Sequence, residues 1–134
     1  MNIKKLLLVL PIALLLFGCP TDDEIPEDEQ VSLEAVTYEV LLFKFTPDTG
    51  NNTSRLQYEI KFTNANNSAI NGFHRITIDA DGLVSTSIAS NHSPCYTIEA
   101  NSDCTLSFDA EDSFDLGRVN SINLVSVEYV LEKD

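Results

Sequence analysis

Positive charge is scarce in this 134-residue sequence, where 8 Lys and Arg residues stand against 21 Asp and Glu residues and give a net charge of −13. Nucleic-acid binding relies on basic side chains that neutralise phosphates, so this composition excludes nucleic acid as a partner. Histidine is scarce too, and no Gly-x-Ser-x-Gly motif accompanies His74 or His92. We therefore expect solvated histidines and no enzyme activity.

A long hydrophobic run is also missing, because the longest one, residues 6–17, has 12 residues. As a helix it would extend about 18 Å, at roughly 1.5 Å per residue. A bilayer core is about 30 Å thick. Lys4 and Lys5 precede the run, and acidic residues follow it. This three-part pattern predicts a secretory signal rather than a membrane span.

The end of the run, Leu16-Phe17-Gly18-Cys19, resembles the lipobox of bacterial lipoproteins. The resemblance implies cleavage after Gly18, so that residues 1–18 are the signal peptide. It also implies acylation of Cys19, with the lipid bilayer as a partner, because two or more acyl chains give a stable anchor. The mature chain would then carry 6 basic and 21 acidic residues, a charge of −15. An ordinary signal peptide with an incidental cysteine is the alternative.

Residues 19–30 are predicted to be an extended tether, because six of the residues 20–30 are acidic and two are proline. The cluster Asp22, Asp23 and Glu24 resembles the export signal of Bacteroidetes-type lipoproteins. That resemblance implies an outer-membrane lipoprotein exposed at the cell surface. The alternative is that acidity only keeps the linker extended.

Cys95 and Cys104 remain once Cys19 is assigned to the lipid. In an exported chain an even pair most simply forms a disulfide. Free thiols and metal ligands are the alternatives, although metal binding needs more donors at close spacing. We expect the residues between the cysteines to form a hairpin turn that sets them on neighbouring strands.

From residue 31 to residue 134 the hydrophobic pattern has a period of two, which predicts strands and not helices. In residues 55–63, apolar positions alternate with polar ones, and Asp81-Gly82 is a hairpin signal. The expected strands are 36–45, 55–63, 73–80, 83–89, 95–99, 104–110 and 122–131. Such a run of short strands predicts one all-β domain, a sandwich of about seven strands.

Two finer expectations concern the C-terminal part of this domain. In the last strand, Val125, Val127, Tyr129 and Leu131 are predicted to share one buried face. The long connection 111–121 is expected to pack back as a partial lid through Phe114 and Leu116.

Residues 56–64 followed by Ser68-Ala69-Ile70 resemble a signature of bacterial immunoglobulin-like modules, and residues 94–108 resemble a second one. The resemblance covers about 55 residues and implies an immunoglobulin-like sandwich. It implies nothing about a ligand. The chain has no tryptophan, so it lacks the buried Trp of antibody-type domains.

No cofactor or metal site is predicted. Asp79-Ala80-Asp81-Gly82 resembles the start of a calcium loop, but Leu83 and Ser90 occupy positions where an EF-hand needs acidic ligands. Weak calcium candidates form the densest acidic group: Asp109, Glu111, Asp112 and Asp115.

These features favour a non-catalytic surface module for binding, adhesion or assembly with another envelope protein. A subunit that captures a soluble ligand such as a glycan is the alternative. Glycan-binding proteins usually expose aromatic side chains, and here most aromatic residues occupy positions predicted to point inward.

Overall fold

The computed structural model describes residues 32–132. The predicted signal peptide, the tether, Cys19 and the export cluster Asp22, Asp23 and Glu24 lie outside the described residues. The elements are β1 (Thr37–Thr46), β2 (Thr53–Asn64), β3 (Ile70–Ala80), β4 (Leu83–Ile88), β5 (Thr97–Ile98), β6 (Ser102–Ser113), the 3₁₀-helix η1 (Phe114–Leu116) and β7 (Ile122–Leu131). The predicted all-β sandwich of about seven strands is confirmed. No helix in the described residues is long and apolar enough to cross a membrane.

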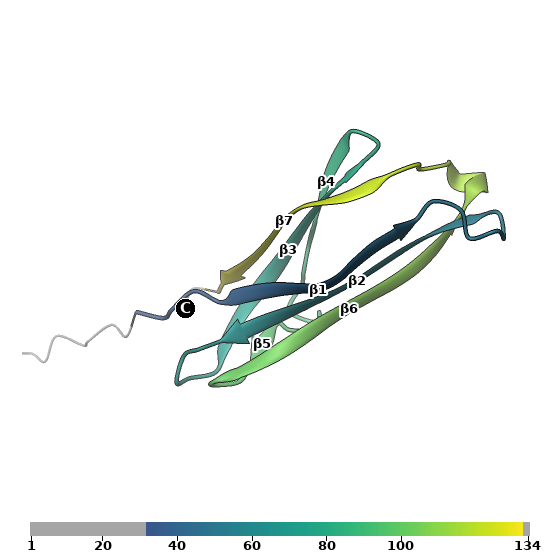
Figure 1. The fold of residues 1–134 in the computed structure, drawn as a ribbon. Helices are drawn as coiled ribbons and strands as arrows, with labels where there is room; N and C mark the ends of the chain where they lie inside the picture. The colour runs from purple at the N-terminus through teal and green to yellow at the C-terminus, as the bar shows by residue number, and fades with distance from the viewer. Residues whose placement is uncertain (1–31, 133–134) are drawn as a thin grey trace, which may run out of the picture. The chain divides into compact units, whose positions relative to one another are not determined.

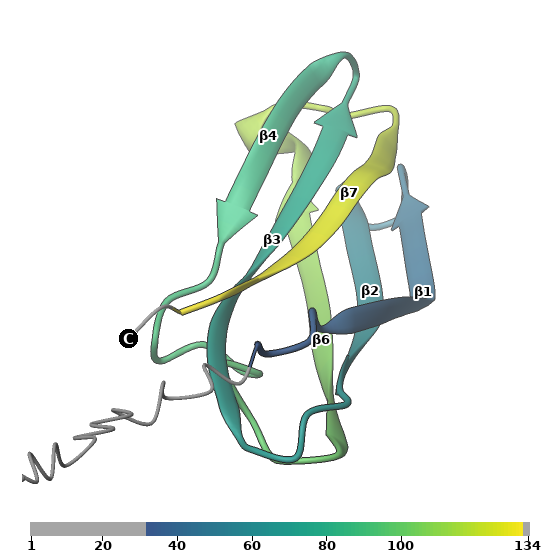
Figure 2. The same ribbon diagram turned by 90° about the vertical axis from the view of Figure 1, so that its left-hand side faces the viewer.

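The strands form two antiparallel sheets that pack face to face (Figures 1 and 2). One sheet has the order β1-β2-β6. In the other, β3 lies centrally, with β7 on one side and with β4 and the two-residue β5 as its further partners. A turn at Asp81-Gly82, in which both residues have positive φ, joins β3 to β4 as predicted.

The distribution of the six long strands matches an immunoglobulin sandwich except at the fourth. The first, second and fifth long strands (β1, β2, β6) share a sheet, and the third and sixth (β3, β7) share the other. In an immunoglobulin constant domain the fourth strand lies beside the fifth. Here β4 pairs with β3 instead. The free edges of β4 and β6 therefore lie on the same side of the sandwich and in different sheets.

The core follows from alternation in the paired strands. In β2, Tyr58, Ile60 and Phe62 are buried, and their partners in β6 continue the same face. The buried apolar residues are Tyr58, Ile60, Phe62, Ile70, Ile76, Cys95, Ile98, Leu106 and Val127. Because only alternate residues of two small sheets face each other, this core is small.

The predicted burial of Val125 is wrong. The register between β3 and β7 shifts so that Thr77 pairs with Ser126 and Ile78 pairs with Leu124. Val125 is the extra residue of this bulge and is 55% exposed, while Leu124 packs against the core in its place. A bulge reverses the face of the residues before it, which simple alternation does not anticipate.

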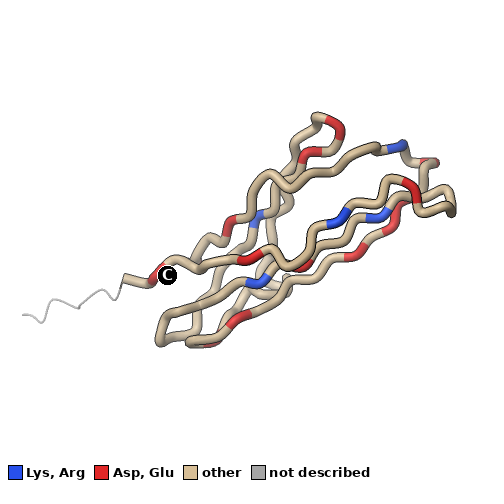
Figure 3. The backbone as a smooth tube through the Cα atoms, viewed as in Figure 1, with Lys and Arg blue, Asp and Glu red and all other residues tan. Residues whose placement is uncertain are grey.

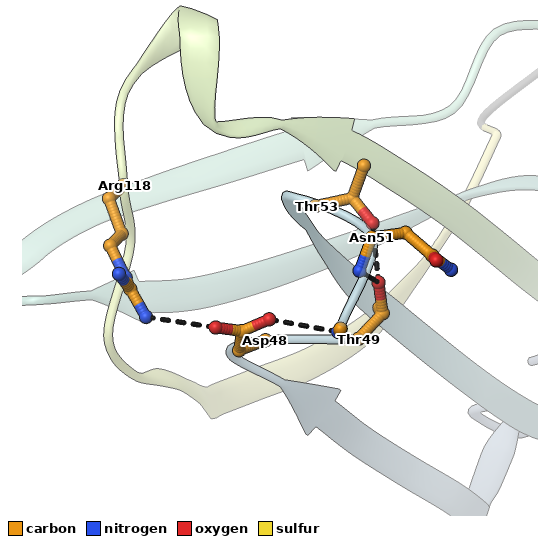
Figure 4. A network of polar contacts seen from close by, with 6 residues as sticks. Asp48, Thr49, Asn51, Thr53 and Arg118 are labelled. Atoms are coloured by element: carbon orange, nitrogen blue, oxygen red, sulfur yellow. Dashed lines mark hydrogen bonds and ion pairs between the residues drawn. The ribbon is translucent and has the colours of Figure 1, made fainter.

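The predicted lid is also wrong with respect to Leu116, which is 86% exposed at the end of η1. Phe114 is partly buried, and the Arg118 guanidinium lies 4.6 Å from its ring centroid. Arg118 also donates a 3.2 Å hydrogen bond to Asp48 in the β1–β2 loop (Figure 4). Polar contacts therefore hold this connection, in place of an apolar lid.

Candidate functional site: an open cleft between the sheets

A cleft of about 190 Å³ opens between the two sheets on the side where β4 and β6 have free edges. Its lining residues come from all four strands around it and are Leu56, Tyr58, Ile76, Ile78, Ser85, Ser87 and Phe108. Figure 1 shows the β3–β4 hairpin rising away from the other sheet. The cleft thus has an apolar floor and hydroxyl groups along its β4 side.

Aromatic side chains form a row across the inner face of the β1-β2-β6 sheet. Phe43, Tyr58 and Phe108 are cross-strand partners, and the rings are stacked with centroid distances of 6.2 Å and 4.7 Å. Tyr58 is buried, and this burial raises the pKa of its hydroxyl. Phe108 ends the row at the cleft and is 40% exposed. A large apolar surface therefore meets solvent at the cleft mouth.

Strand β4 leaves the cleft open because its inward positions carry small side chains. Ser85 and Ser87 pair with Ile78 and Ile76 and line the cleft, whereas larger apolar residues occupy the matching positions of the other strands. Every residue of β4 is exposed. Serines at the two inward positions of a strand flanked by Leu, Val and Ile were the signal in the sequence for this site.

The opposite end of the sandwich, which we call the closed end, is held by Asn64, Gly72, Cys95, Cys104 and Tyr129. The Asn64 side chain is fully buried and donates to the carbonyl oxygens of Ser68, Ile98 and Glu99 at 2.9–3.1 Å. Its Oδ1 accepts hydrogen bonds from the backbone and side-chain nitrogens of Asn66. The Asn64 side-chain amide thus forms hydrogen bonds with backbone groups of two loops, and these groups would otherwise be buried without partners.

A second contact at the closed end is made by Tyr129 over Gly72. A Cβ atom on Gly72 would lie 2.4 Å from Tyr129 Cε1 and 2.6 Å from the Val130 carbonyl oxygen, so only glycine fits. The Tyr129 hydroxyl donates to the carbonyl oxygens of Cys95 and Tyr96, both at 2.9 Å. Burial, with a smaller contribution from Tyr96, raises the pKa of Tyr129 to about 12.

The predicted disulfide between Cys95 and Cys104 is present, with a Cα–Cα distance of 5.6 Å. The hairpin that was predicted to carry the two cysteines is not found in the described residues. Cys95 precedes β5, which pairs with β3, whereas Cys104 lies in β6 of the other sheet. The bond therefore joins the two sheets at the closed end, whereas the sequence predicted a link between adjacent strands.

The four calcium candidates lie apart in different environments. Asp109 accepts two hydrogen bonds from the Arg55 guanidinium, which lowers the pKa of its carboxyl group. Glu111 instead accepts hydrogen bonds from Thr49 and Thr53. Asp112 is exposed on β6, and Asp115 lies in η1. Within residues 32–132, no group of three or more His, Cys, Asp or Glu side chains is placed to hold a metal ion.

The two histidines differ in their surroundings. His92 is exposed in the loop after β4. His74 is buried, against our expectation, and its ring stacks on Phe62 with a centroid distance of 5.8 Å. Burial lowers the pKa of His74, and the nearby Pro94 carbonyl offsets this only in part. Neither ring nitrogen makes a hydrogen bond of normal geometry to the described residues, so a neutral imidazole is favoured.

Asp81 joins the β3–β4 hairpin to the loop before β7. Its carboxylate accepts hydrogen bonds from the backbone and side-chain groups of Asn120 and Ser121, at distances of 2.8–3.2 Å. The backbone hydrogen bond from Asn120 contributes most to lowering the pKa of Asp81. Asp81, the third residue of the motif that resembles the start of a calcium loop, thus fixes the hairpin that carries β4.

No protein-family model, curated protein or solved structure matches this chain.

Proposed function

We propose that this protein is a non-catalytic binding and assembly module, anchored by an acylated Cys19 and displayed at the outer-membrane surface of a bacterium. The observation that carries the binding role is the open apolar cleft beside the uncharged strand β4. Well-packed domains contain few voids of this size, and exposed apolar surface commonly marks an interaction site.

The size and setting of the cleft favour a protein partner. Its volume of about 190 Å³ is below the roughly 300–1,000 Å³ typical of small-molecule sites. A dry apolar cavity of about 150 Å³ takes a benzene molecule, so this cleft suits one or two apolar side chains. The cleft also opens along free strand edges, which offer main-chain hydrogen bonds to a second polypeptide.

Glycan capture is the second candidate, and one observation favours it. Phe108 presents an exposed ring at the cleft mouth, and Ser85 and Ser87 supply hydroxyl groups. A sugar would need more directional polar partners than two serines, because each of its buried hydroxyl groups must be hydrogen-bonded. Titration with soluble envelope glycans is the test, with perturbed Phe108 ring resonances as the result that would favour this role.

Photo-crosslinking in intact cells tests the binding role. A benzophenone amino acid replaces the exposed Val84 on β4, and a matched variant carries it at the exposed Lys44 on the outer face of the other sheet. We expect a discrete adduct with one envelope protein from position 84 and none from position 44. Equal labelling from both positions, or no adduct at all, would contradict this proposal.

The anchor is tested separately, because it is proposed from residues that precede Ser32. Mass spectrometry of the mature N-terminus is expected to show a diacylated or triacylated Cys19, and Cys19→Ala is expected to release the protein from the membrane. Protease added to intact cells is expected to clip residues 20–30. Protection from the protease that is unchanged when Asp22, Asp23 and Glu24 are replaced by Ala would argue against surface display.

A further inference from the structure

Strand β4 differs from the other edge strands of the described sandwich in having no feature that prevents pairing. Its sequence, Leu-Val-Ser-Thr-Ser-Ile, has no charge and no proline, and among the described residues β3 is its only strand partner. The edges of β1 and β7 are interrupted by bulges. Strand β6 carries four acidic residues, Asp103, Asp109, Glu111 and Asp112. The remaining edge strand, β5, has only two residues. Bulges, charges and short length are devices by which proteins block edge-to-edge pairing, so β4 alone is left open.

The free edge of β4 presents a regular set of backbone groups. Because the Asp81-Gly82 turn has two residues, Ala80 and Leu83 form the hydrogen-bonded closing pair, and every second pair after it is hydrogen-bonded too. The Ala89 N–H, which donates to the His74 carbonyl at 2.9 Å, keeps this alternation. The N–H and C=O groups of Val84, Thr86 and Ile88 therefore point away from β3, as a strand partner requires.

The side chains beside this edge divide into two rows. Ser85 and Ser87 face the cleft, whereas Val84 and Ile88 lie on the outer face of the sheet and are 58% and 63% exposed. A strand added to β4 would place every second side chain over the cleft, between the two serines and Phe108. Its remaining side chains would lie beside Val84 and Ile88, where small or β-branched residues pack well.

We propose that the free edge of β4 accepts an extended segment of a partner protein as an additional β-strand, whose alternate apolar side chains fill the cleft between the sheets. This inference rests on the proposed binding role and specifies its chemistry. The segment is uncharged and apolar at every second position over about six residues. It is followed by Lys or Arg, because β6, whose free edge lies on the same side of the sandwich, carries four acidic residues (Figure 3).

A second copy of this chain does not meet these requirements. Two β4 strands paired edge to edge would set Ser85 and Ser87 of one copy beside those of the other, so the apolar clefts would stay empty. In addition, each mature copy would carry a net charge of −15, so like copies repel.

The test uses the full chain, purified from membranes in detergent and labelled with ¹⁵N. The probe is a pool of blocked nine-residue peptides with Val, Ile, Leu or Phe at alternate positions, Thr between them, and a Lys at each end. We expect slowed exchange of the Val84, Thr86 and Ile88 amide protons by tenfold or more when the pool is added. A pool with the same composition but without alternation serves as the control and should give no slowing.

Replacement of Thr86 by proline tests how much main-chain hydrogen bonds of β4 contribute to peptide affinity. Thr86→Pro removes an N–H that β3 does not use, so the hairpin is expected to remain folded. It also removes a hydroxyl that lies 2.8 Å from the Thr77 hydroxyl. Thr77→Val breaks that same contact and is the matched control. We expect peptide affinity to fall at least about fivefold in Thr86→Pro, through one lost hydrogen bond, and to be unchanged in Thr77→Val.

A second variant keeps the test valid if Thr86→Pro unfolds the hairpin. Val84→Lys with Ile88→Lys changes only exposed side chains and gives β4 the charges found on other edges. We expect this double variant to abolish peptide protection while its thermal unfolding matches the parent protein.

Several outcomes would overturn strand addition: no protected amides in β4, protection confined to β1, β6 or β7, or a concentration-dependent dimer that gives the same protection without peptide. The proposed function is judged independently by crosslinking in cells. An adduct at position 84 without peptide protection would retain the binding role and reject strand addition. Protection without any adduct in cells would reject the binding role.

Discussion

The two ends of this sandwich differ in how completely side chains fill the space between the sheets. At the closed end, a disulfide and a buried amide join the sheets, and a tyrosine reaches over a glycine within one of them. At the cleft, serines stand where apolar side chains would close the gap, and an aromatic ring is left partly in solvent. The stability of the domain is therefore concentrated at one end, which leaves the other free to present unfilled apolar surface.

The strongest test of this difference is the replacement of Asn64 by Ala at the closed end. The variant leaves three carbonyl groups and two Asn66 nitrogens without their partner. We expect a loss of about 3–4 kcal/mol in the free energy of unfolding, measured by urea denaturation. Asn67→Ala, at an exposed neighbouring position, is the control and should change stability by no more than about 0.5 kcal/mol. Equal losses would mean that the buried network does not hold this end.

Removal of the disulfide should lower the free energy of unfolding by less than Asn64→Ala does. Cys95 and Cys104 are nine residues apart, and closing so short a loop stabilises a chain by roughly 2–3 kcal/mol. Cys95→Ser with Cys104→Ser is expected to fold with a lower melting temperature, because the Asn64 and Tyr129 contacts remain. Thiol titration of the denatured, unreduced protein should find neither cysteine free. An unfolded double variant would show that the noncovalent contacts cannot hold the end alone.

At the cleft, a substitution should raise stability. Ser85→Val places two methyl groups toward the apolar floor, and we expect the free energy of unfolding to increase by about 0.5–1 kcal/mol. Ser107→Val, on the outward face of β6, is the matched control for strand propensity and should gain less. The filled variant should also bind the peptide pool less tightly. Equal gains from the two variants would argue that the cleft is not a packing defect.

The smallest expected effect is a pH dependence from His74. Burial lowers the pKa of His74 in the folded protein below its unfolded value of about 6.5, so the unfolded chain binds more protons between these values. The contribution of His74 to the free energy of unfolding is fully present above about pH 6.5. It is lost as the pH falls from there toward the folded-state pKa, and the free energy then changes by at most about 1.4 kcal/mol per pH unit.

The variant His74→Phe keeps a flat ring against Phe62 and should flatten that slope between pH 7 and pH 5. His92→Gln, in an exposed loop, should leave the slope unchanged. Urea denaturation at a series of pH values measures both, and a His74→Phe protein with the parental slope would assign the acid sensitivity to other groups.

The sequence predicted those features that depend on neighbours along the chain. Alternation in residues 55–63 located β2 and its buried face, and Asp81-Gly82 located a turn whose φ angles it favours. Two cysteines in a chain expected to be exported were enough to predict a bond between them, although not which elements it joins.

What the sequence did not predict depends on register and on the choice of strand partner. The bulge at Val125 exchanges the buried face within one strand, and nothing in the residues 122–131 marks where it falls. The pairing of β4 with β3, and not with β6, decides that a cleft exists at all. Two further signals stand in the sequence: the inward serines of β4, and Asn64 at the end of the alternating strand β2.

Asn66, which the buried Asn64 holds at the closed end, also binds the backbone of the chain that enters the domain. Asn66 accepts from the Glu34 backbone N–H at 2.8 Å and donates to its carbonyl at 3.0 Å. A pull on the chain before Ser32 is therefore transmitted first through Asn66, then through Asn64 and the loops that the disulfide braces. Under the proposed lipid anchor, drag on a partner bound at the cleft would pass through the domain to the anchored chain, and the end of the domain that takes this load is the covalently reinforced one.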